Sequence, residues 1–168
     1  MGIRQQLEDT IMIETNQTLP NHTFNLLTEN GMTTPSTADL FANQKVVMFA
    51  VPGAFTPTCS ARHLPGFVEN FDTFKEKGID RIICISVNDA FVMKAWGDAQ
   101  SAANIDMLAD GDGAFTKTLG LGKETGVFGG YRSQRYAMLV ENQTVTQLWL
   151  EEPKAFEVSS AEAVLANL

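Results

Sequence analysis

The sequence is poor in cysteine, in histidine and in positive charge, and it has no long apolar run. Two cysteines in 168 residues are too few for a disulfide scaffold, which favours a reducing compartment or thiols kept for their reactivity. Twelve lysines and arginines stand against 20 aspartates and glutamates, giving a net charge of −8. Such a chain repels phosphate backbones and anionic lipid, so we expect neither nucleic acid nor a membrane as a partner. With no signal-peptide pattern and no stretch of membrane-spanning length, the sequence predicts a cytoplasmic protein.

What is present has the composition of one folded domain. Hydrophobic residues make up 44% of the chain and charged residues 19%, proportions typical of a globular protein. No repeat, low-complexity tract or linker rich in proline, glycine and serine divides the sequence. Residues 1–12 show weak periodicity and are interpreted as an N-terminal extension, and residues 13–168 are interpreted as the domain itself.

Two nearly continuous apolar runs, Lys45–Ala50 and Arg81–Val87, are typical of strands that are buried on both faces. Between them, three phenylalanines at helical spacing predict a helix over residues 66–77, which Gly78 is placed to end. A strand, a helix and a strand at this spacing form a βαβ unit, in which the two strands are parallel.

The second half of the chain predicts more strands and two more helices. The expected strands cover residues 105–109, 136–140 and 144–150, and the last two flank a hairpin turn. Asp89 is expected to cap a helix whose apolar face includes Phe91, Val92, Ala95 and Trp96. Ser159–Glu162 predicts a capping box before the final helix. A βαβ half followed by a ββα half predicts an α/β protein with a thioredoxin-like fold, in which helices flank a central mixed sheet.

The candidate chemistry lies in the loop that follows the first strand. This loop reads VPGAFTPTCS, residues 51–60, and places Cys59 where the next helix should begin. The unpaired N–H groups and the dipole of a helix start favour a thiolate over a thiol. Thr56 stands close enough along the chain to direct its hydroxyl at the sulfur, while Pro52 and Pro57 stiffen the loop. The segment therefore predicts a rigid pocket around one reactive sulfur.

Other interpretations of these residues stay open at this point. A free cysteine is commonly a buried, inert side chain, and this interpretation is strongest for Cys84, which lies within a run of isoleucine and valine. His63 follows Cys59 by one helical turn, so a Cys–His pair of a cysteine hydrolase is the second enzymatic hypothesis. A redox sensor or holdase using the same thiolate is the non-enzymatic hypothesis. The two cysteines with His22 and His63 lack the usual ligand spacing of zinc sites, so no metal is expected.

A family resemblance rests on the same loop. The pattern Pro52-x-x-x-Thr56-x-x-Cys59 resembles the peroxiredoxin active-site signature. The longer string VPGAFTPTCSARHLPGF is similar to the type II, peroxiredoxin-five-like group, including the peroxiredoxin domain of bacterial peroxiredoxin–glutaredoxin hybrids. Four later segments resemble that group in the same order: RIICISVNDAFVMKAW from residue 81, LADG from 108, RSQRYAMLV from 132 and EVSSAEAVL from 157.

The resemblance implies a thiol peroxidase with no metal, haem or flavin cofactor. Cys59 matches the peroxidatic cysteine, Thr56 and Pro52 match its pocket partners, and Arg135 matches the active-site arginine. Arg132 is interpreted either as a brace for Arg135 or as an exposed charge. The Cys59 thiolate is expected to attack hydrogen peroxide or an organic hydroperoxide and to become a sulfenic acid.

The resemblance also bears on reduction and assembly. An external thiol is expected to recycle the sulfenic acid, with glutathione and glutaredoxin ahead of thioredoxin by analogy. Cys84 matches a second cysteine that type II relatives are said to use for resolution, so it is retained as a possible resolving thiol. A homodimer formed near the active-site loops is implied in the same way.

Overall fold

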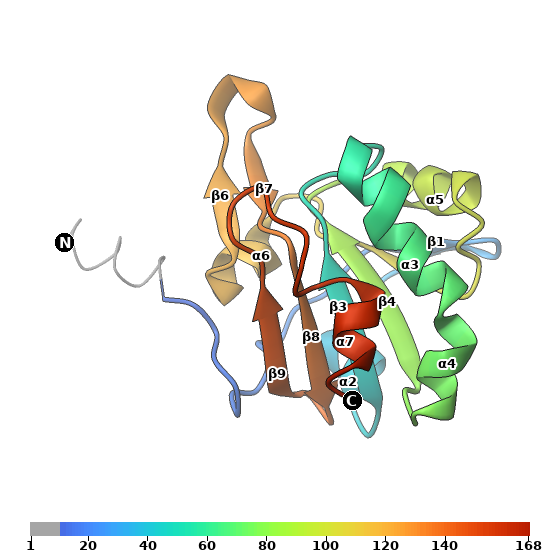
Figure 1. Cartoon of the computed structure of the whole chain (residues 1–168). Coiled ribbons are helices and arrows are strands. Elements are labelled where there is room, and N and C mark those ends of the chain that lie inside the picture. The colour runs from blue at the N-terminus through green and yellow to red at the C-terminus, as the bar shows by residue number, and fades with distance from the viewer. Residues whose placement is uncertain (1–10) are drawn as a thin grey trace.

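The structure, a computed structural model, describes residues 11–168 and is built on a five-stranded mixed sheet (Figure 1). The sheet order is β5-β4-β3-β8-β9, comprising β3 (Lys45–Ala50), β4 (Arg81–Ser86), β5 (Asp106–Ala109), β8 (Tyr136–Glu141) and β9 (Thr144–Leu150). The first three strands run parallel, and β8 is antiparallel to both β3 and β9. The predicted α/β fold with a central mixed sheet is confirmed. Most of the predicted extension, residues 1–10, lies outside the described residues.

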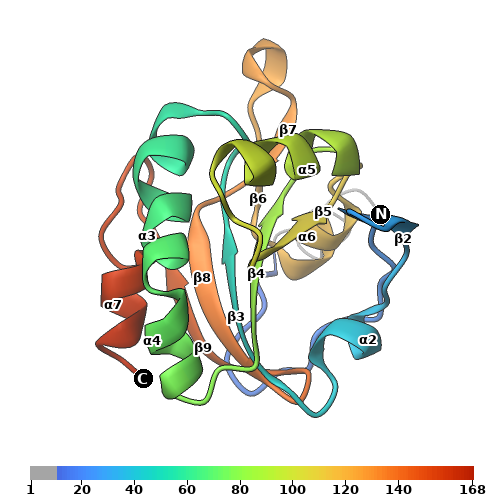
Figure 2. The same ribbon diagram turned by 90° about the vertical axis from the view of Figure 1, so that its right-hand side faces the viewer.

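Helices cover both faces of this sheet (Figure 2). They are α2 (Thr37–Phe41), the π-helical turn η1 (Cys59–His63), α3 (Leu64–Glu69), α4 (Phe71–Glu76), α5 (Ala90–Ala99), α6 (Ala114–Leu119) and α7 (Ala161–Leu165). Two small hairpins, β1–β2 (Leu26–Thr28, Gly31–Thr33) and β6–β7 (Gly122–Glu124, Tyr131–Ser133), lie outside the main sheet, and the 3-10 turn η2 (Gly126–Phe128) forms the tip of the second hairpin. Within residues 11–168, no helix is long and apolar enough to span a membrane.

The apolar runs in the central strands are explained by a core on each face. Val47 and Phe49 of β3 pack in the cluster beneath α3, α4, α5 and α7, whereas Val46 and Met48 pack in the cluster beneath α2 and α6. Successive side chains of a strand point to opposite faces of the sheet, so a strand that is covered on both faces has apolar side chains on both.

The helix predicted over residues 66–77 is longer and less regular than expected. It begins at Leu64, and it is interrupted at Asn70, which has φ −98° and ψ 11°. The side-chain Nδ2 of Asn70 donates to the Gly66 carbonyl at 2.8 Å, a local bond of the kind that competes with regular helix geometry. Gly78 has φ +89°, which confirms it as the residue that ends the segment.

The apolar face predicted for α5 is confirmed at Trp96, which is fully buried, and wrong at Phe91 and Ala95. Phe91 is 67% exposed and Ala95 is exposed, while Met93 is fully buried. The helix turns Gly97 toward β5, where an added Cβ would lie 2.7 Å from Cγ of Met107. This close approach to the sheet fixes the rotation of the helix, and it points Phe91 outward.

The two predicted helix caps have different outcomes. Asp89 caps α5 as expected, because its side chain accepts a hydrogen bond from the first turn. The final helix is capped by Ser160, which accepts from the Ala163 N–H at 3.1 Å, and not by Ser159. Ser159 does not serve as the cap because its hydroxyl is bonded to Glu151.

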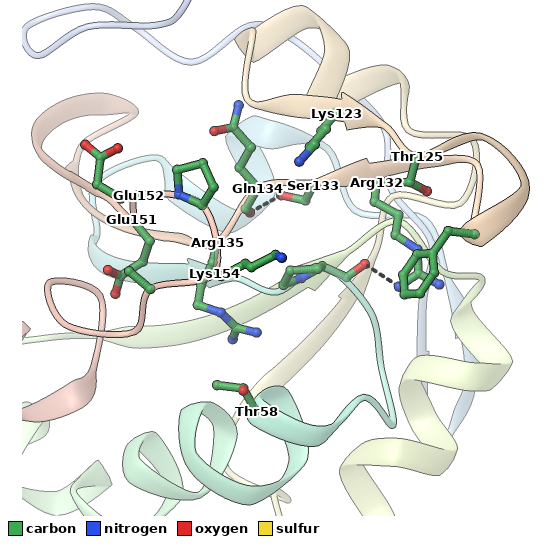
Figure 3. Close-up of a pocket in the computed structure, with 14 residues that line it drawn as sticks. Thr58, Lys123, Thr125, Arg132, Ser133, Gln134, Arg135, Glu151, Glu152 and Lys154 are labelled. Atoms are coloured by element: carbon green, nitrogen blue, oxygen red, sulfur yellow. Dashed lines mark hydrogen bonds between the residues drawn. The ribbon is translucent and has the colours of Figure 1, made fainter.

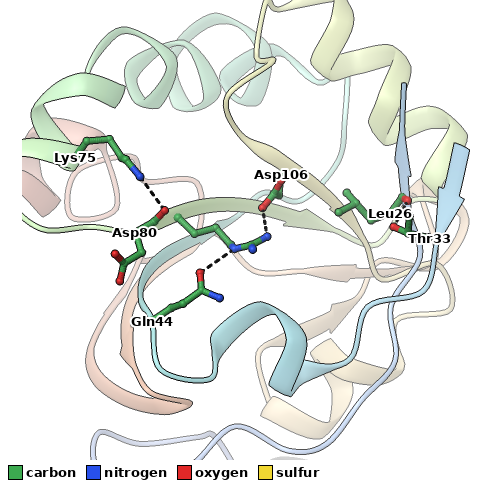
Figure 4. A network of polar contacts seen from close by, with 7 residues as sticks. Leu26, Thr33, Gln44, Lys75, Asp80 and Asp106 are labelled. Atoms are coloured by element: carbon green, nitrogen blue, oxygen red, sulfur yellow. Dashed lines mark hydrogen bonds and ion pairs between the residues drawn. The ribbon is translucent and has the colours of Figure 1, made fainter. Parts of the chain in front are cut away.

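Polar contacts hold the amino ends of β4 and β5 together. Arg81 donates to Gln44 at 3.2 Å and to Asp106 at 2.6 Å (Figure 4). The carboxyl ends of the parallel strands lie at the opposite edge of the sheet, and loops lead from there to the helices. In open α/β sheets this is the edge at which functional sites form.

Candidate active site

Cys59 lies beyond the carboxyl end of β3, as predicted, but it is not the first helical residue. Thr58 already has helical dihedrals, φ −67° and ψ −37°, and Cys59 opens the π-helical turn η1. The Leu64 N–H donates to the Cys59 carbonyl to close this wider turn. Cys59 is fully buried, so the sulfur lies beneath neighbouring side chains in this conformation. Turns of this type are found frequently at functional sites.

Arg135 is brought to the sulfur by the register of the sheet. Tyr136, the first residue of β8, pairs with Ala50, the last residue of β3, so the entrance of β8 lies beside the loop that holds Cys59. Nη2 of Arg135 donates to Sγ of Cys59 at 3.1 Å. A fixed guanidinium in this position attracts negative charge, both on the sulfur and on an oxygen that reacts with it.

His63 holds Arg135 rather than Cys59. Its Nε2 lies 2.9 Å from the Ser159 carbonyl, which can only accept, so the ring proton is on Nε2. Its Nδ1 therefore accepts from Nη1 of Arg135 at 2.8 Å. Burial, assisted by the positive charge of Arg135, lowers the pKa of His63 to about 3, so the ring is neutral at physiological pH. Sequence reasoning missed this role because it considered His63 as a partner of the cysteines and not of Arg135.

Glu151 fixes the loop that holds His63. Its Oε2 accepts four hydrogen bonds between 2.7 and 3.0 Å, from the backbone N–H groups of Glu157, Val158 and Ser159 and from the Ser159 hydroxyl. Burial acts to raise the pKa of Glu151, but these hydrogen bonds outweigh it and lower the pKa. The carboxylate thus fixes Ser159, Ser159 fixes His63, and His63 fixes Arg135.

Phe156 completes the support for the arginine. Its ring lies edge-on to His63, with centroids 5.0 Å apart, and the guanidinium carbon of Arg135 lies 5.8 Å from its centre. Arg62 stacks on the same ring at 4.6 Å. Sequence reasoning did not find Phe156 or Glu151, because both lie in an irregular segment with no helical or strand period.

Thr56 and Arg132 support the loop in ways the sequence did not predict. The Thr56 hydroxyl donates to the Gly53 carbonyl at 2.7 Å, so its proton is directed at the loop backbone and not at the sulfur. Nη1 of Arg132 donates to the Pro52 carbonyl at 3.3 Å, and its guanidinium lies 5.4 Å from the centre of the Phe128 ring. Arg132 therefore braces the Pro52 loop instead of Arg135.

A cavity of about 340 Å³ opens beside these residues (Figure 3). It is lined by Pro52, Thr58, Arg132 and Arg135, together with residues of the β6–β7 hairpin and of the loop 151–155 that follows β9. In Figure 3 the Arg135 side chain extends toward the helical turn that carries Thr58, the neighbour of Cys59. Access to the sulfur is therefore expected from this side.

Cys84 has the properties of a buried structural thiol. It lies in the middle of the sheet, paired with Phe49, and it is fully buried in the same hydrophobic cluster as Cys59. Burial raises its pKa well above the usual value, and the nearby Cys59 acts in the same direction. Both cysteines are free thiols. Among the described residues, no three His, Cys, Asp or Glu side chains are grouped to hold a metal ion.

Comparison with known proteins agrees with this arrangement. The family model described as Redoxin matches residues 14–165. Peroxiredoxin-2D of Arabidopsis thaliana is 46% identical over 155 residues, which cover 89% of this chain and 94% of that protein. The hybrid peroxiredoxin hyPrx5 of Haemophilus influenzae is 43% identical over 155 residues, 89% of this chain and 64% of its own length. The crystal structure of reduced Prx3 from Vibrio vulnificus in complex with hydrogen peroxide has a TM-score of 0.91 at 60% identity, covering 93% of this chain and 99% of that one. The chain therefore belongs to the redoxin family and, within it, to the peroxiredoxins of type II.

Proposed function

We propose that this peroxiredoxin reduces hydrogen peroxide and organic hydroperoxides at Cys59. The thiolate attacks one peroxide oxygen, the O–O bond breaks, and the other oxygen leaves as water or alcohol after taking up a proton. The sulfur is oxidised to a sulfenic acid, and the peroxide is reduced by two electrons. The 3.1 Å contact between Arg135 and the Cys59 sulfur carries this proposal. The solved Vibrio relative, which holds hydrogen peroxide, supports the same substrate class.

The surrounding residues suit this reaction. The breaking O–O bond places negative charge on the leaving oxygen, and Arg135 is already fixed beside the reacting sulfur, so little reorganisation is needed. Because the Thr56 hydroxyl donates to Gly53, its oxygen is left to accept a hydrogen bond from a hydroperoxide. Pro52 lies in the wall of the cavity and has no backbone N–H to donate into it.

The geometry does not support a cysteine hydrolase. A general base for Cys59 needs a free imidazole nitrogen, and both nitrogens of His63 are engaged, with Ser159 and Arg135. A sensor or holdase that uses the same thiolate is distinguished by turnover. Catalytic consumption of a large molar excess of peroxide over protein is expected, and a single stoichiometric reaction would favour the sensor.

Reduction of the sulfenic acid is assigned to an external thiol, glutathione with glutaredoxin or else thioredoxin. The structure supports this assignment through the burial of Cys84 in a central strand and the raised pKa of its thiol, which make it a poor nucleophile at neutral pH. The cavity beside Cys59, in contrast, opens to solvent and offers an outside thiol a route.

The sulfenic acid itself is the first prediction. After one equivalent of hydrogen peroxide, a dimedone adduct is expected on Cys59 by peptide mass spectrometry, and none on Cys84. The matched control is Cys84→Ser, which is expected to give the same adduct. An adduct on another residue, or no adduct in either protein while peroxide is consumed, would overturn the assignment of Cys59.

We further propose a homodimer, formed at the end of the molecule that carries the active-site loops. Large apolar side chains are exposed there: Phe55 is 56% exposed and Phe91 67%, and Val127 and Phe128 are exposed at the hairpin tip. The elements that carry them lie at one end of the sheet in both views (Figures 1 and 2). Exposed apolar clusters commonly mark contact surfaces.

Sedimentation at micromolar protein is expected to show a species of twice the 18.4 kDa chain mass. Phe91→Ser is expected to shift this equilibrium toward the monomer, because it removes an exposed apolar side chain without touching the core. Met32→Ser, at an exposed apolar position on the β1–β2 hairpin, is the control and should leave the equilibrium unchanged. A monomer at all concentrations would contradict the proposal.

A further inference from the structure

The cavity beside Cys59 is basic in a protein that is acidic overall. Four cations line it, namely Lys123, Arg132, Arg135 and Lys154, against the carboxylates of Glu151 and Glu152. The whole chain has twelve cations and a net charge of −8, so a third of its positive side chains gather at this one cavity. Such a concentration creates a local field opposite in sign to that of the molecule as a whole.

Among the described residues, none of these four cations forms an ion pair. The ion pairs found among residues 11–168 are Lys45–Glu141, Arg81–Asp106 and Lys94–Asp98, and all lie away from the cavity. Lys123 and Lys154 make no hydrogen bond or ion pair with a described residue, and Arg132 donates to a backbone carbonyl and not to a carboxylate. Oε2 of Glu151 is already committed to four donors.

The cations also share one space. Figure 3 shows Lys123 on the β6–β7 hairpin, Lys154 on the loop after β9 and Arg135 below both, with its side chain extending furthest toward Thr58. A ligand that reaches Cys59 through this cavity passes within reach of these charges. Hydrogen peroxide is neutral and much smaller than 340 Å³, so the charged part of the cavity has no evident use in binding it.

We infer that this basic cavity is a carboxylate-binding subsite, and that its ligand is a small anionic thiol of the glutathione class that reduces oxidised Cys59. The inference rests on the proposed function. The sulfur of the thiolate attacks the sulfenic sulfur, an S–S bond forms, and the hydroxyl leaves as water after taking up a proton. A second thiolate attacks the mixed disulfide at the outside sulfur, so that the small disulfide leaves and the Cys59 thiolate is restored. Two thiols are oxidised and one sulfenic acid is reduced.

The charge of the protein explains why a subsite is needed for this step. A thiolate ligand with carboxylates is repelled by a molecule of net charge −8, and the sulfenic acid that it attacks is uncharged. Carboxylate contacts with Lys123 and Lys154 offset that repulsion and bring the thiol to the side of the cavity from which Cys59 is reached. The same lysines can bind the carboxylate of a hydroperoxide. The test therefore has to distinguish an anionic thiol from an anionic hydroperoxide as the ligand.

The test measures the reaction of pre-oxidised protein with thiols of different charge. Protein treated with one equivalent of hydrogen peroxide is mixed with anionic 3-mercaptopropionate or with neutral 2-mercaptoethanol, and rate constants are compared per thiolate. Trp96 reports on the reaction by fluorescence, because its indole N–H donates to Ser60, the neighbour of Cys59, at 3.0 Å. We expect the anionic thiol to react faster, and the advantage to shrink with added salt.

The variant that decides the matter is Lys123→Gln with Lys154→Gln. The rate constant for the anionic thiol, divided by that for the neutral thiol, is expected to fall roughly tenfold. Two ion pairs are lost, and an exposed ion pair contributes up to about fivefold in affinity. The control is Lys77→Gln with Lys117→Gln, which makes the same charge change at two exposed positions outside the cavity and should leave the ratio unchanged. If the ratio falls equally in the control and in the variant of the two cavity lysines, the effect comes from net charge alone and the subsite is overturned.

Two further outcomes separate this inference from its alternatives. If reduced protein prefers linoleic acid hydroperoxide to cumene hydroperoxide through the same lysines, while the thiols show no charge preference, the subsite serves the oxidant and the thiol assignment is wrong. Mass spectrometry of the oxidised protein before thiol is added shows whether Cys59 carries the sulfenic acid. Its absence would overturn the proposed function, and the inference with it, whereas its presence with no charge preference would overturn the subsite alone.

Discussion

Cys59→Ser is expected to abolish peroxide turnover, whereas Cys84→Ser is expected to keep most of it. The first substitution removes the sulfur to which Arg135 donates, and a serine hydroxyl does not ionise at neutral pH to attack a peroxide. The second removes a fully buried thiol whose pKa is raised by its surroundings. Turnover is measured as NADPH oxidation coupled through glutathione reductase, glutathione and glutaredoxin.

The retention expected for Cys84→Ser follows from where the strand lies. A disulfide needs Cα atoms within about 7 Å and suitably directed Cβ atoms. Strand β4 is held between β3 and β5, and moving it would expose Ile82, Ile83 and Ile85, at roughly 1.5–3 kcal/mol each. Both cysteines are free thiols in the structure, so a movement that joins them falls on η1 and not on β4, which gives an external thiol time to react first.

The contrasting outcome is well defined. A loss in Cys84→Ser comparable to that in Cys59→Ser would make Cys84 an obligatory resolving thiol and the burial argument wrong. Cys84→Ala is the companion variant, because serine places a hydroxyl in an apolar cluster and destabilises the fold. Turnover close to that of the parent in the alanine variant would show that the sulfur itself is dispensable.

The sequence predicted the sheet better than it predicted the site. Strands such as Lys45–Ala50 have a strong local signal, because burial on both faces leaves a run of apolar residues that no loop resembles. The rotation of α5 had no such signal, since it depends on the contact of Gly97 with Met107 across the helix–sheet interface. Cys59 was found because a reactive cysteine in a proline-rich loop is itself a local pattern.

The support behind Arg135 was not predictable in this way. His63, Arg135, Glu151 and Ser159 come from four separate segments, and only the folded sheet and the C-terminal loop bring them together. Each of these residues, taken alone, is an ordinary polar side chain. Hydrogen-bond partners that are distant in sequence leave no periodicity, so a single sequence reveals the arginine through family resemblance but not what holds it.

Arg135→Ala is expected to lower the second-order rate constant for hydrogen peroxide by roughly 10²–10³, the loss typical when one preorganised donor is removed from a reacting centre. The guanidinium supplies the hydrogen bond to the Cys59 sulfur and the positive charge nearest the leaving oxygen. Stopped-flow oxidation of the protein by hydrogen peroxide measures this rate constant.

Arg62→Ala is the matched control for charge. Arg62 stacks on the same Phe156 ring as Arg135, but its side chain donates no hydrogen bond to Cys59 or His63, so its loss removes an equal charge without removing a donor. Its rate constant is expected to stay within about threefold of the parent, since exposed charges near a site are screened by solvent and salt. Equal losses in Arg62→Ala and Arg135→Ala would mean that the general field, and not the placed guanidinium, accelerates the reaction.

Arg135→Lys separates charge from placement at the same position. Lysine keeps the positive charge, but its single ammonium cannot reproduce two parallel N–H donors, one toward the Cys59 sulfur and one toward Nδ1 of His63. We therefore expect the rate constant to remain much closer to that of Arg135→Ala than to that of the parent. Full recovery of the rate by lysine would show that His63 and the Glu151 loop hold a charge whose exact direction is unimportant. Failure of lysine to restore the rate would assign the fixed orientation of Arg135 to catalysis.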